Sequence, residues 1–248
     1  MNRYVHPYAA ERFHELLSPH SVRLLVIDPP YSGVAKSKWD HRRKDPRVFA
    51  EWLSGVMLSF LPKLTHDGSI LFFGGTGMQG NRAFLHTLLA MDASPMMFRN
   101  WITWGKRKAY GKEFDYLYTR EEIAWYSVSH EYREVCFNIP LTDELRGYKG
   151  FNPKYPAKSD YKWVTNVWND IPELFKTRRE CEKPVPLLRR IVETHSNPGD
   201  LVVDCFTGLG ASGVAALSSG RAFFGCDEDS EAVETAETDC IAAAEAFQ

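Results

Sequence analysis

The chain has 248 residues, of which 44% are hydrophobic and 13% aromatic, enough to bury the core of one α/β domain with an insertion. No apolar run approaches the roughly 18 residues that a membrane span needs, and the N-terminus lacks the apolar segment of a signal peptide, so we expect a cytoplasmic protein. The five cysteines are widely spaced without a C-x-x-C pair, which argues against a metal site or disulfides. The net charge of −2 is uneven: residues 225–248 hold eight acidic residues and no Lys or Arg, and the mildly basic remainder permits a polyanionic partner.

The first elements in chain order are a short helix over residues 9–17 and a strand over residues 22–27. The second segment, Val-Arg-Leu-Leu-Val-Ile, has the length and composition of a buried strand. In open α/β sheets, ligands bind at the carboxyl ends of such strands. The residues that follow position 27 are therefore candidates for a site.

Those residues are Asp28-Pro29-Pro30-Tyr31. Each Pro fixes its own φ and restricts the residue before it, so Asp28 and Pro29 are held extended and their carbonyls point in fixed directions. A carboxylate and fixed carbonyls beside an aromatic ring suit a planar substrate that carries an exocyclic amino group. The alternative is a Pro-stiffened turn after a core strand.

The segment after Tyr31 is polar and basic without periodicity, and we predict a mobile loop over residues 32–44. Residues 46–64 have helical spacing, with an apolar stripe that we assign to the core. A strand bounded by glycines is predicted over 68–74 and a helix over 81–91. Two more strands are expected over 96–104 and 121–127.

Two stretches combine basic and aromatic residues, over 99–112 and 146–163. The second has five Lys or Arg against one Asp. Lys and Arg neutralise phosphates, and aromatic rings stack on bases, so both stretches are candidates for nucleic-acid binding. An irregular solvated loop is the alternative.

A third feature lies near the C-terminus, after a helix predicted over 184–195. A buried strand over 201–204 runs into Gly208, Gly210 and Gly213, which have the G-x-G-x-x-G spacing of loops that approach a ligand at a helix N-terminus. A strand over 221–227 then ends in Asp227, and an acidic residue there typically holds ribose hydroxyls. A Gly-rich turn of any α/β protein is the alternative.

The order of these parts is informative. Only 35 residues follow Gly213, enough for one helix, one strand and a final helix. The remaining strands of a nucleotide-binding sheet must come from the N-terminal part, including the strand that ends in Asp28. This rotated order brings the two carboxyl-end sites to the same edge of one sheet.

On these motifs the chain resembles the amino-group DNA methyltransferases that use S-adenosylmethionine, in the motif order called the beta group. The matching segments are Asp28-Pro29-Pro30-Tyr31, Glu182-Lys183-Pro184 and Asp204-Cys205-Phe206-Thr207-Gly208-Leu209-Gly210. The resemblance covers most of the chain outside roughly 130–165. Such proteins commonly carry a Gly-Asp pair before the first strand, which this chain lacks, so no adenine contact of the cofactor is assigned there.

The resemblance implies one α/β domain over 1–248, a Rossmann-like methyltransferase sheet with circularly permuted motif order, and a small inserted target-recognition region at about 130–165. It implies site-specific methylation of adenine N6, on a base flipped out of double-stranded DNA in the nucleoid. Cytosine N4 methylation and a non-catalytic DNA-binding module on the same fold are the alternatives. A homodimer stays open.

Residue roles follow from the same resemblance. The Asp28 carboxylate and the Pro29 carbonyl would accept the two amino N–H groups, beside Pro30, and Tyr31 would stack on the base. The cofactor would be held by Phe206, Gly208 and Gly210 along its wall, by Asp204 and Lys183 at its methionine end and by Asp227 at its ribose. The DNA-binding candidates are Lys36, Lys38, Arg42, Arg43, Lys106, Arg107, Lys149 and Lys154.

Competing functions fit less of the sequence. A nicotinamide-dependent oxidoreductase shares the glycine fingerprint, but it leaves Asp28-Pro29-Pro30-Tyr31 unexplained. Methyl transfer to cytosine C5 needs a cysteine nucleophile, usually after a Pro, and the chain has no Pro-Cys dipeptide. Methylation of RNA is not separated from methylation of DNA by the sequence.

Overall fold

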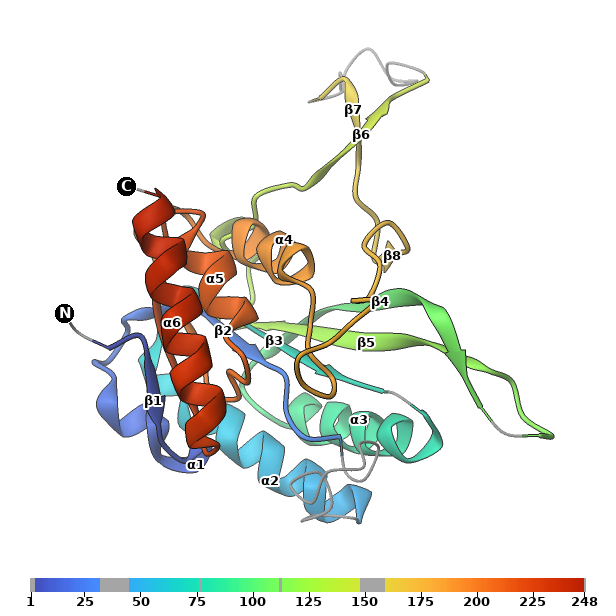
Figure 1. Ribbon diagram of the computed structural model, residues 1–248, viewed down its shortest axis with the longest axis horizontal. Helices are drawn as coiled ribbons and strands as arrows, with labels where there is room; N and C mark the ends of the chain where they lie inside the picture. The colour runs from blue at the N-terminus through green and yellow to red at the C-terminus, as the bar shows by residue number, and fades with distance from the viewer. Residues whose placement is uncertain (1–2, 32–44, 76, 112, 148–158, 248) are drawn as a thin grey trace.

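A computed structural model describes residues 3–31, 45–75, 77–111, 113–147 and 159–247. It has three layers: a central sheet, with helices α4, α5 and α6 over one face and α1, α2 and α3 over the other (Figure 1). The helices are α1 Ala10–Phe13, α2 Pro46–Ser59, α3 Gly77–Asp92, α4 Val185–His195, α5 Ala211–Leu217 and α6 Ser230–Phe247.

The central sheet has eight strands in the order β1-β10-β9-β2-β3-β5-β4-β8. The first five are mutually parallel, and β5 runs antiparallel to both of its neighbours. The strands are β1 Val5–Pro7, β10 Ala222–Asp227, β9 Leu201–Asp204, β2 Val22–Ile27, β3 Leu64–Gly74, β5 Tyr118–Ser127, β4 Met97–Tyr110 and β8 Val167–Trp168. The amino end of β5 therefore lies at the same edge as the carboxyl ends of β2 and β3.

The predicted α/β class and rotated strand order are confirmed. β2 pairs in parallel with β9, and Val26 lies beside Asp204 in their register. Among the described residues, α5, β10 and α6 follow the glycine loop. The motif at the end of β2 and the glycine loop after β9 are consequently neighbours.

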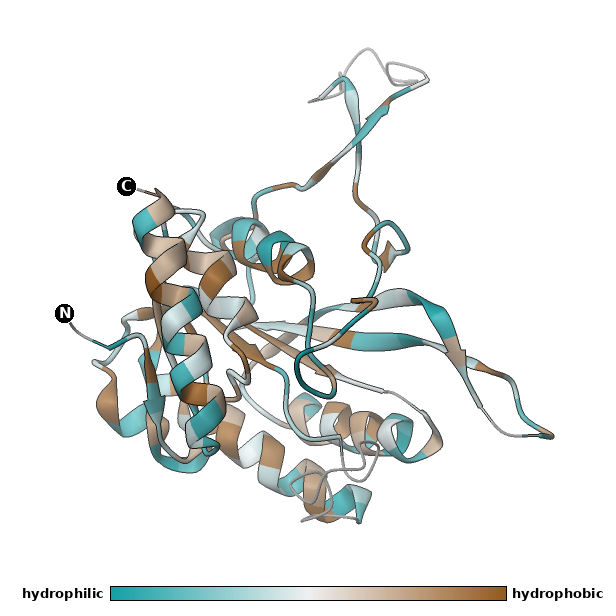
Figure 2. Ribbon diagram, in the orientation of Figure 1, coloured by the Kyte–Doolittle hydropathy of each residue, from teal (hydrophilic) through white to brown (hydrophobic). Residues whose placement is uncertain are grey.

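The helices bury an apolar face against the strands because their hydrophobic residues recur at helical spacing. In α2 this stripe is the predicted one, with Phe49, Leu53 and Met57 in the core. The predicted helix over 46–64 is too long, because α2 ends at Ser59 and a 3-10 turn containing Pro62, which has no N–H to donate, follows it. The central strands are the brown interior of Figure 2.

Two projections leave this body in Figure 1. The ribbon of β4 and β5 runs past the sheet, and a separate two-stranded sheet, β6 Leu141–Leu145 with β7 Tyr161–Trp163, stands away from it and is mostly teal or pale in Figure 2. The short strands β1, β6, β7 and β8 were not predicted. The loop predicted over 32–44 lies outside the described residues.

No helix in the described part of the chain is both long and apolar enough to cross a membrane.

Candidate active site

A cavity of about 310 Å³ opens at the carboxyl ends of β2, β9 and β10. Ligand sites in proteins start at about this size. Its lining includes residues from each of the predicted site segments: Asp28, Pro29, Pro30, Tyr31, Lys183, Asp204, Phe206, Gly208 and Asp227. Sheet order thus brings together segments that are separated by about two thirds of the chain, as the rotated order predicted. Gly210 is not among the lining residues, and it lies on the side of the loop that packs against α6.

Asp28 directly follows β2 and is ion-paired. The Lys183 ammonium lies 2.8 Å from Asp28 Oδ1 and 2.7 Å from Oδ2. Burial raises the pKa of Asp28, and the Glu121 carboxylate adds to that effect, whereas Lys183 opposes it. Although burial alone would lower the pKa of Lys183, its two carboxylate neighbours raise it. The ammonium therefore stays charged at neutral pH.

Tyr31 packs in the core beneath this pair and is 6% exposed. Its hydroxyl donates to Asp28 Oδ1 at 2.7 Å and to Glu121 Oε2 at 3.3 Å. Burial, with two carboxylates nearby, raises the pKa of the phenol far above its usual range, so it remains a donor. Tyr31 thus fixes the rotation of the Asp28 carboxylate.

Asp204 ends β9 on the neighbouring strand and is 3% exposed. Its Oδ1 accepts from the Phe206 N–H at 2.8 Å, and its Oδ2 accepts from the Ser212 hydroxyl at 2.5 Å. Burial raises the pKa of Asp204 to about 7. No ion pair joins it to a Lys or Arg of the described residues, so a buried carboxylate faces the cavity ready for a ligand cation.

The glycine loop has the geometry that its sequence predicted. Gly208 and Gly210 have φ of +53° and +86°, which side chains rarely adopt. The Gly208 N–H donates to Asp227 Oδ2 at 2.9 Å, so the carboxylate at the end of β10 holds the loop. At Gly210 a Cβ would lie 3.0 Å from the Cα of Ala236, because α6 packs directly against the loop.

An aromatic wall closes another side of the cavity. Trp52 of α2 meets Phe206 edge-on, with 5.7 Å between ring centroids, and both line the cavity. The Trp52 Nε1–H donates to Glu11 Oε1 at 2.6 Å, which fixes the indole. The sequence assigned the apolar stripe of this helix to the core, and Trp52 packs against that core, partly buried, while it also lines the cavity.

The predicted DNA-binding residues are placed only in part. Lys106 of β4 forms an ion pair with Glu121 and is 17% exposed, so its ammonium points into the protein. The Arg107 N–H donates to Glu173 Oε2 at 2.9 Å. The other six candidates, Lys36, Lys38, Arg42, Arg43, Lys149 and Lys154, lie outside the described residues.

Comparison with known proteins decides the family. A model of the N6 and N4 methyltransferases, described as DNA methylase, matches residues 22–238. The chain belongs to this DNA methylase family. The methylase is 32% identical to the Type II methyltransferase M1.MboII of Moraxella bovis, with 94% of each chain covered, and 40% identical to the DNA adenine methyltransferase YhdJ of Escherichia coli, with 86% of this chain and 74% of the relative covered.

Solved structures have the same fold. The cytosine-N4-specific PvuII DNA methyltransferase aligns with a TM-score of 0.71 at 15% identity, over 98% of this chain and 91% of that one. The complex of M1.HpyAVI with S-adenosylmethionine aligns with a TM-score of 0.59 at 19% identity, over 94% and 98%. The fold is therefore that of the beta-group methyltransferases, and the protein is an S-adenosylmethionine-dependent DNA methyltransferase. A non-catalytic module is not favoured.

The residues of the cavity fit this cofactor. The unpaired Asp204 carboxylate matches the ammonium of its methionine part, and the aromatic wall of Trp52 and Phe206 matches apolar and ring surface. In the part of the chain that is described, no group of three or more His, Cys, Asp or Glu side chains is placed to hold a metal ion.

Sequence reasoning missed Glu121. It begins the inner part of β5, is 3% exposed, and pairs with both Lys183 and Lys106. A signal was present, because two consecutive acidic residues, Glu121 and Glu122, interrupt a strand whose later residues are apolar. A carboxylate is almost never buried without a partner, so such a pair at a strand end indicates a polar cluster.

Proposed function

We propose that this methylase transfers a methyl group to adenine N6 at a specific site in double-stranded DNA, within a single domain over residues 1–248. The observation that carries the proposal is the Asp28 carboxylate at the wall of the cavity, held by Tyr31 and followed by Pro29, which also lines the cavity. Asp in the first position of this motif accompanies adenine more often than cytosine N4. The E. coli relative, named a DNA adenine methyltransferase, supports the same base.

The target amino group is a poor nucleophile because its lone pair is delocalised into the ring. In the proposed mechanism Asp28 and the Pro29 carbonyl accept its two N–H groups, which localises the lone pair on nitrogen and aims it. The bound cofactor supplies an electrophilic methyl group: a C–N bond forms, the C–S bond breaks, and the nitrogen then loses one proton to solvent. The rate enhancement comes from positioning and charge stabilisation, with no covalent enzyme intermediate.

The base must leave the duplex to reach this edge. We propose that it lies against Tyr31, whose ring lines the cavity. Phe206 and Gly208 would form the cofactor wall, Asp204 would hold the methionine ammonium, and Asp227 the ribose. Lys183 is the proposed partner of the methionine carboxylate, while two of its N–H groups already meet Asp28.

DNA contacts are proposed for Arg107, which has an exposed position on β4, and for the six candidates outside the described residues, Lys36, Lys38, Arg42, Arg43, Lys149 and Lys154. Lys106 is left out because its ammonium pairs with Glu121 inside the protein. We further propose that residues 130–165 recognise the target sequence and that the protein acts on the nucleoid in the cytoplasm. We propose that it needs no structural metal. A homodimer is the proposed assembly to test. Because each phosphate contact releases counterions, binding to DNA should weaken steeply with salt. An affinity that is independent of salt would contradict the basic contacts.

The test is transfer of labelled methyl from S-adenosylmethionine to unmethylated duplex DNA, followed by digestion to nucleosides and mass analysis. N6-methyl-2′-deoxyadenosine is the expected product. N4-methyl-2′-deoxycytidine would keep the fold and mechanism but overturn the choice of base. No transfer to duplex DNA, with transfer to RNA instead, would overturn the choice of substrate.

A further inference from the structure

Four charged side chains form a row that the transfer step does not fully use. Asp28 meets Lys183, Lys183 meets Glu121, and Glu121 meets Lys106. The side chains of Lys183 and Glu121 are 5% and 4% exposed, so the centre of the row is buried. Two carboxylates and two ammoniums balance in charge, and they come from four separate segments: the end of β2, the segment before α4, β5 and β4.

Glu121 does not belong to the cavity wall described above. Its Oε2 lies 3.4 Å from the Lys183 ammonium and accepts from Tyr31 at 3.3 Å. It therefore touches the two groups that hold Asp28 without reaching the substrate position. Lys183 is also bounded by rings, with its ammonium 5.1 Å from the Tyr31 centroid and 5.2 Å from that of Phe73, so it has little room to move.

The hydrogen-bonding capacity of Asp28 is almost filled. A carboxylate offers about four acceptor directions. Lys183 takes two and Tyr31 takes one, which leaves about one for a substrate N–H. A second carboxylate, Glu121, lies 3.4 Å from the Lys183 ammonium and offsets part of its charge. Without it, the whole charge of Lys183 would act on Asp28 and weaken Asp28 as an acceptor.

We infer that Glu121 is a positioning residue for methyl transfer: it shares the Lys183 ammonium and the Tyr31 hydroxyl with Asp28, and so keeps Asp28 available to the amino group of the substrate. This inference rests on the proposed function. Lys106, on the other side of Glu121, balances the second carboxylate. The net charge of the row is then zero, whereas loss of Glu121 would leave it positive.

The next residue supplies a matched control. Glu122 is 2% exposed, but it points to the opposite face of the sheet, because successive side chains alternate along a strand. Its Oε2 accepts from Trp101 Nε1 at 2.6 Å and from Thr103 Oγ1 at 2.8 Å. Glu122→Gln therefore removes a buried carboxylate of the same strand without touching the row.

The experiment measures single-turnover methyl transfer between pH 5 and 9 for the wild type, Glu121→Gln and Glu122→Gln, with DNA KM and S-adenosylhomocysteine affinity. Glu121→Gln should lower the transfer rate roughly 10- to 100-fold with affinities changed less than about threefold. Glu121 raises the pKa of Asp28, so its removal should move the acid limb of the rate profile to lower pH. Glu122→Gln should keep the wild-type shape.

The titratable groups around Asp28 must be considered together. Lys183→Met removes the cation that lowers the pKa of Asp28. The acid limb of the rate profile of this variant should therefore move to higher pH, opposite to the shift in Glu121→Gln. Glu121→Asp keeps the charge and should recover part of the rate with the limb near its wild-type position. The groups facing Asp28 are Tyr31 on its own segment, Lys183 and Cys181 before α4, Glu121 on β5 and Asp204 on β9.

The outcomes separate the two proposals. A wild type that binds S-adenosylhomocysteine but transfers no methyl to DNA overturns the proposed function. An active wild type with an unchanged or merely scaled profile in Glu121→Gln overturns only the role of Glu121. Should Glu121→Gln fail to fold, Lys106→Met gives the same test, because it leaves Glu121 to attract Lys183 more strongly and should move the acid limb to higher pH.

Discussion

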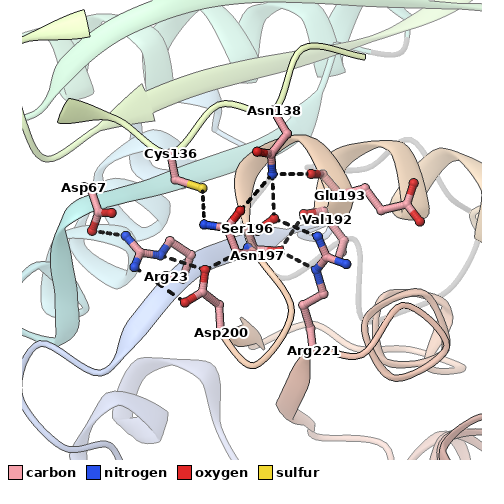
Figure 3. A network of polar contacts seen from close by, with 10 residues as sticks. All are labelled: Arg23, Asp67, Cys136, Asn138, Val192, Glu193, Ser196, Asn197, Asp200 and Arg221. Atoms are coloured by element: carbon pink, nitrogen blue, oxygen red, sulfur yellow. Dashed lines mark hydrogen bonds and ion pairs between the residues drawn. The ribbon is translucent and has the colours of Figure 1, made fainter. Parts of the chain in front are cut away.

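The two edges of the central sheet carry polar clusters that differ in how many hydrogen-bond acceptors they leave available for a ligand. At the carboxyl edge, Asp28, Lys183 and Asp204 surround a cavity of about 310 Å³ and keep acceptor capacity for a ligand. At the amino edge, the network of Figure 3 joins the starts of β2, β9 and β10 to the chain after β5. There the groups satisfy one another.

The centre of the amino-edge network is Arg23 of β2. It forms ion pairs with Asp67 and with Asp200, whose Oδ2 lies 3.0 Å from Arg23 Nε and also accepts from the Asn197 N–H at 2.8 Å (Figure 3). The three strands β2, β3 and β9 are thus tied together where they begin.

The other half of the network centres on Asn138. Its Nδ2 donates to the carbonyls of Glu193 and Ser196, both at 2.9 Å, and the Ser196 carbonyl also accepts from Arg221 Nη2 at 2.8 Å (Figure 3). These carbonyls end α4, where a helix lacks internal donors. The chain that leads to the β6–β7 projection is anchored here.

The comparison separates residues for chemistry from residues for stability. A polar cluster that is complete in itself stabilises the fold, and one that faces a cavity with acceptors left over is available for a ligand. Substitutions at the carboxyl edge should therefore change methyl transfer, and substitutions at the amino edge should change unfolding.

The largest effect is expected for Asp28→Ala. Loss of the acceptor should lower the transfer rate by roughly 10²- to 10³-fold or more, with DNA binding largely kept. Labelled methyl transfer and a DNA-binding titration measure both. Asp200→Ala removes an aspartate from the amino edge and should leave the transfer rate of the folded protein within about twofold. Equal losses of rate in the two variants would contradict the assignment of chemistry to the carboxyl edge and stability to the amino edge.

Arg23→Met should give the next largest effect, on stability. It leaves Asp67 and Asp200 without their cation, and since these carboxylates are partly exposed we expect a loss of about 2–3 kcal/mol in the free energy of unfolding. Urea unfolding measures it. Arg12→Met, which removes an exposed pair with Glu15, is the control and should change little. An Arg23→Met protein as stable as the wild type would show that the pairs contribute nothing net.

His195 makes stability depend on pH. Burial between the rings of Trp125 and Phe137 lowers its pKa from 6.5 to about 3. The unfolded chain binds the proton first, so stability is complete above about pH 6.5 and falls as the pH drops toward 3. As the pH falls from 7 to 5, this histidine should lower the free energy of unfolding by about 2 kcal/mol. His195→Leu removes the titration, and an unchanged pH slope of urea unfolding in that variant would contradict this origin.

The smallest effect is expected for Asn138→Ala. Losing the bonds to the end of α4 should cost about 1 kcal/mol of unfolding free energy. Amide hydrogen exchange in the last turn of α4 should accelerate, whereas the rate of methyl transfer on short DNA should stay unchanged. Protection equal to the wild type would indicate that water replaces the Asn138 amide.

Much of the fold was predictable because its signals are local. The apolar run before Asp28, the glycines after β9 and the helical stripe of α2 each depend on neighbours in sequence, and all were placed correctly within a few residues. The strands β6, β7 and β8 were missed since they are two to five residues long and mostly exposed, so no apolar alternation marks them.

By itself, the sequence determined which residues could do chemistry and the edge of the sheet where they meet. Proline and glycine fix backbone conformation locally, and the order of the motifs along the chain indicated the rotated order. Only the tertiary structure decided the partners: Lys183 meets Asp28 across 155 residues, and Tyr31 meets Glu121 across 90. Such pairings depend on strand order and register, which bring side chains together that no local pattern connects.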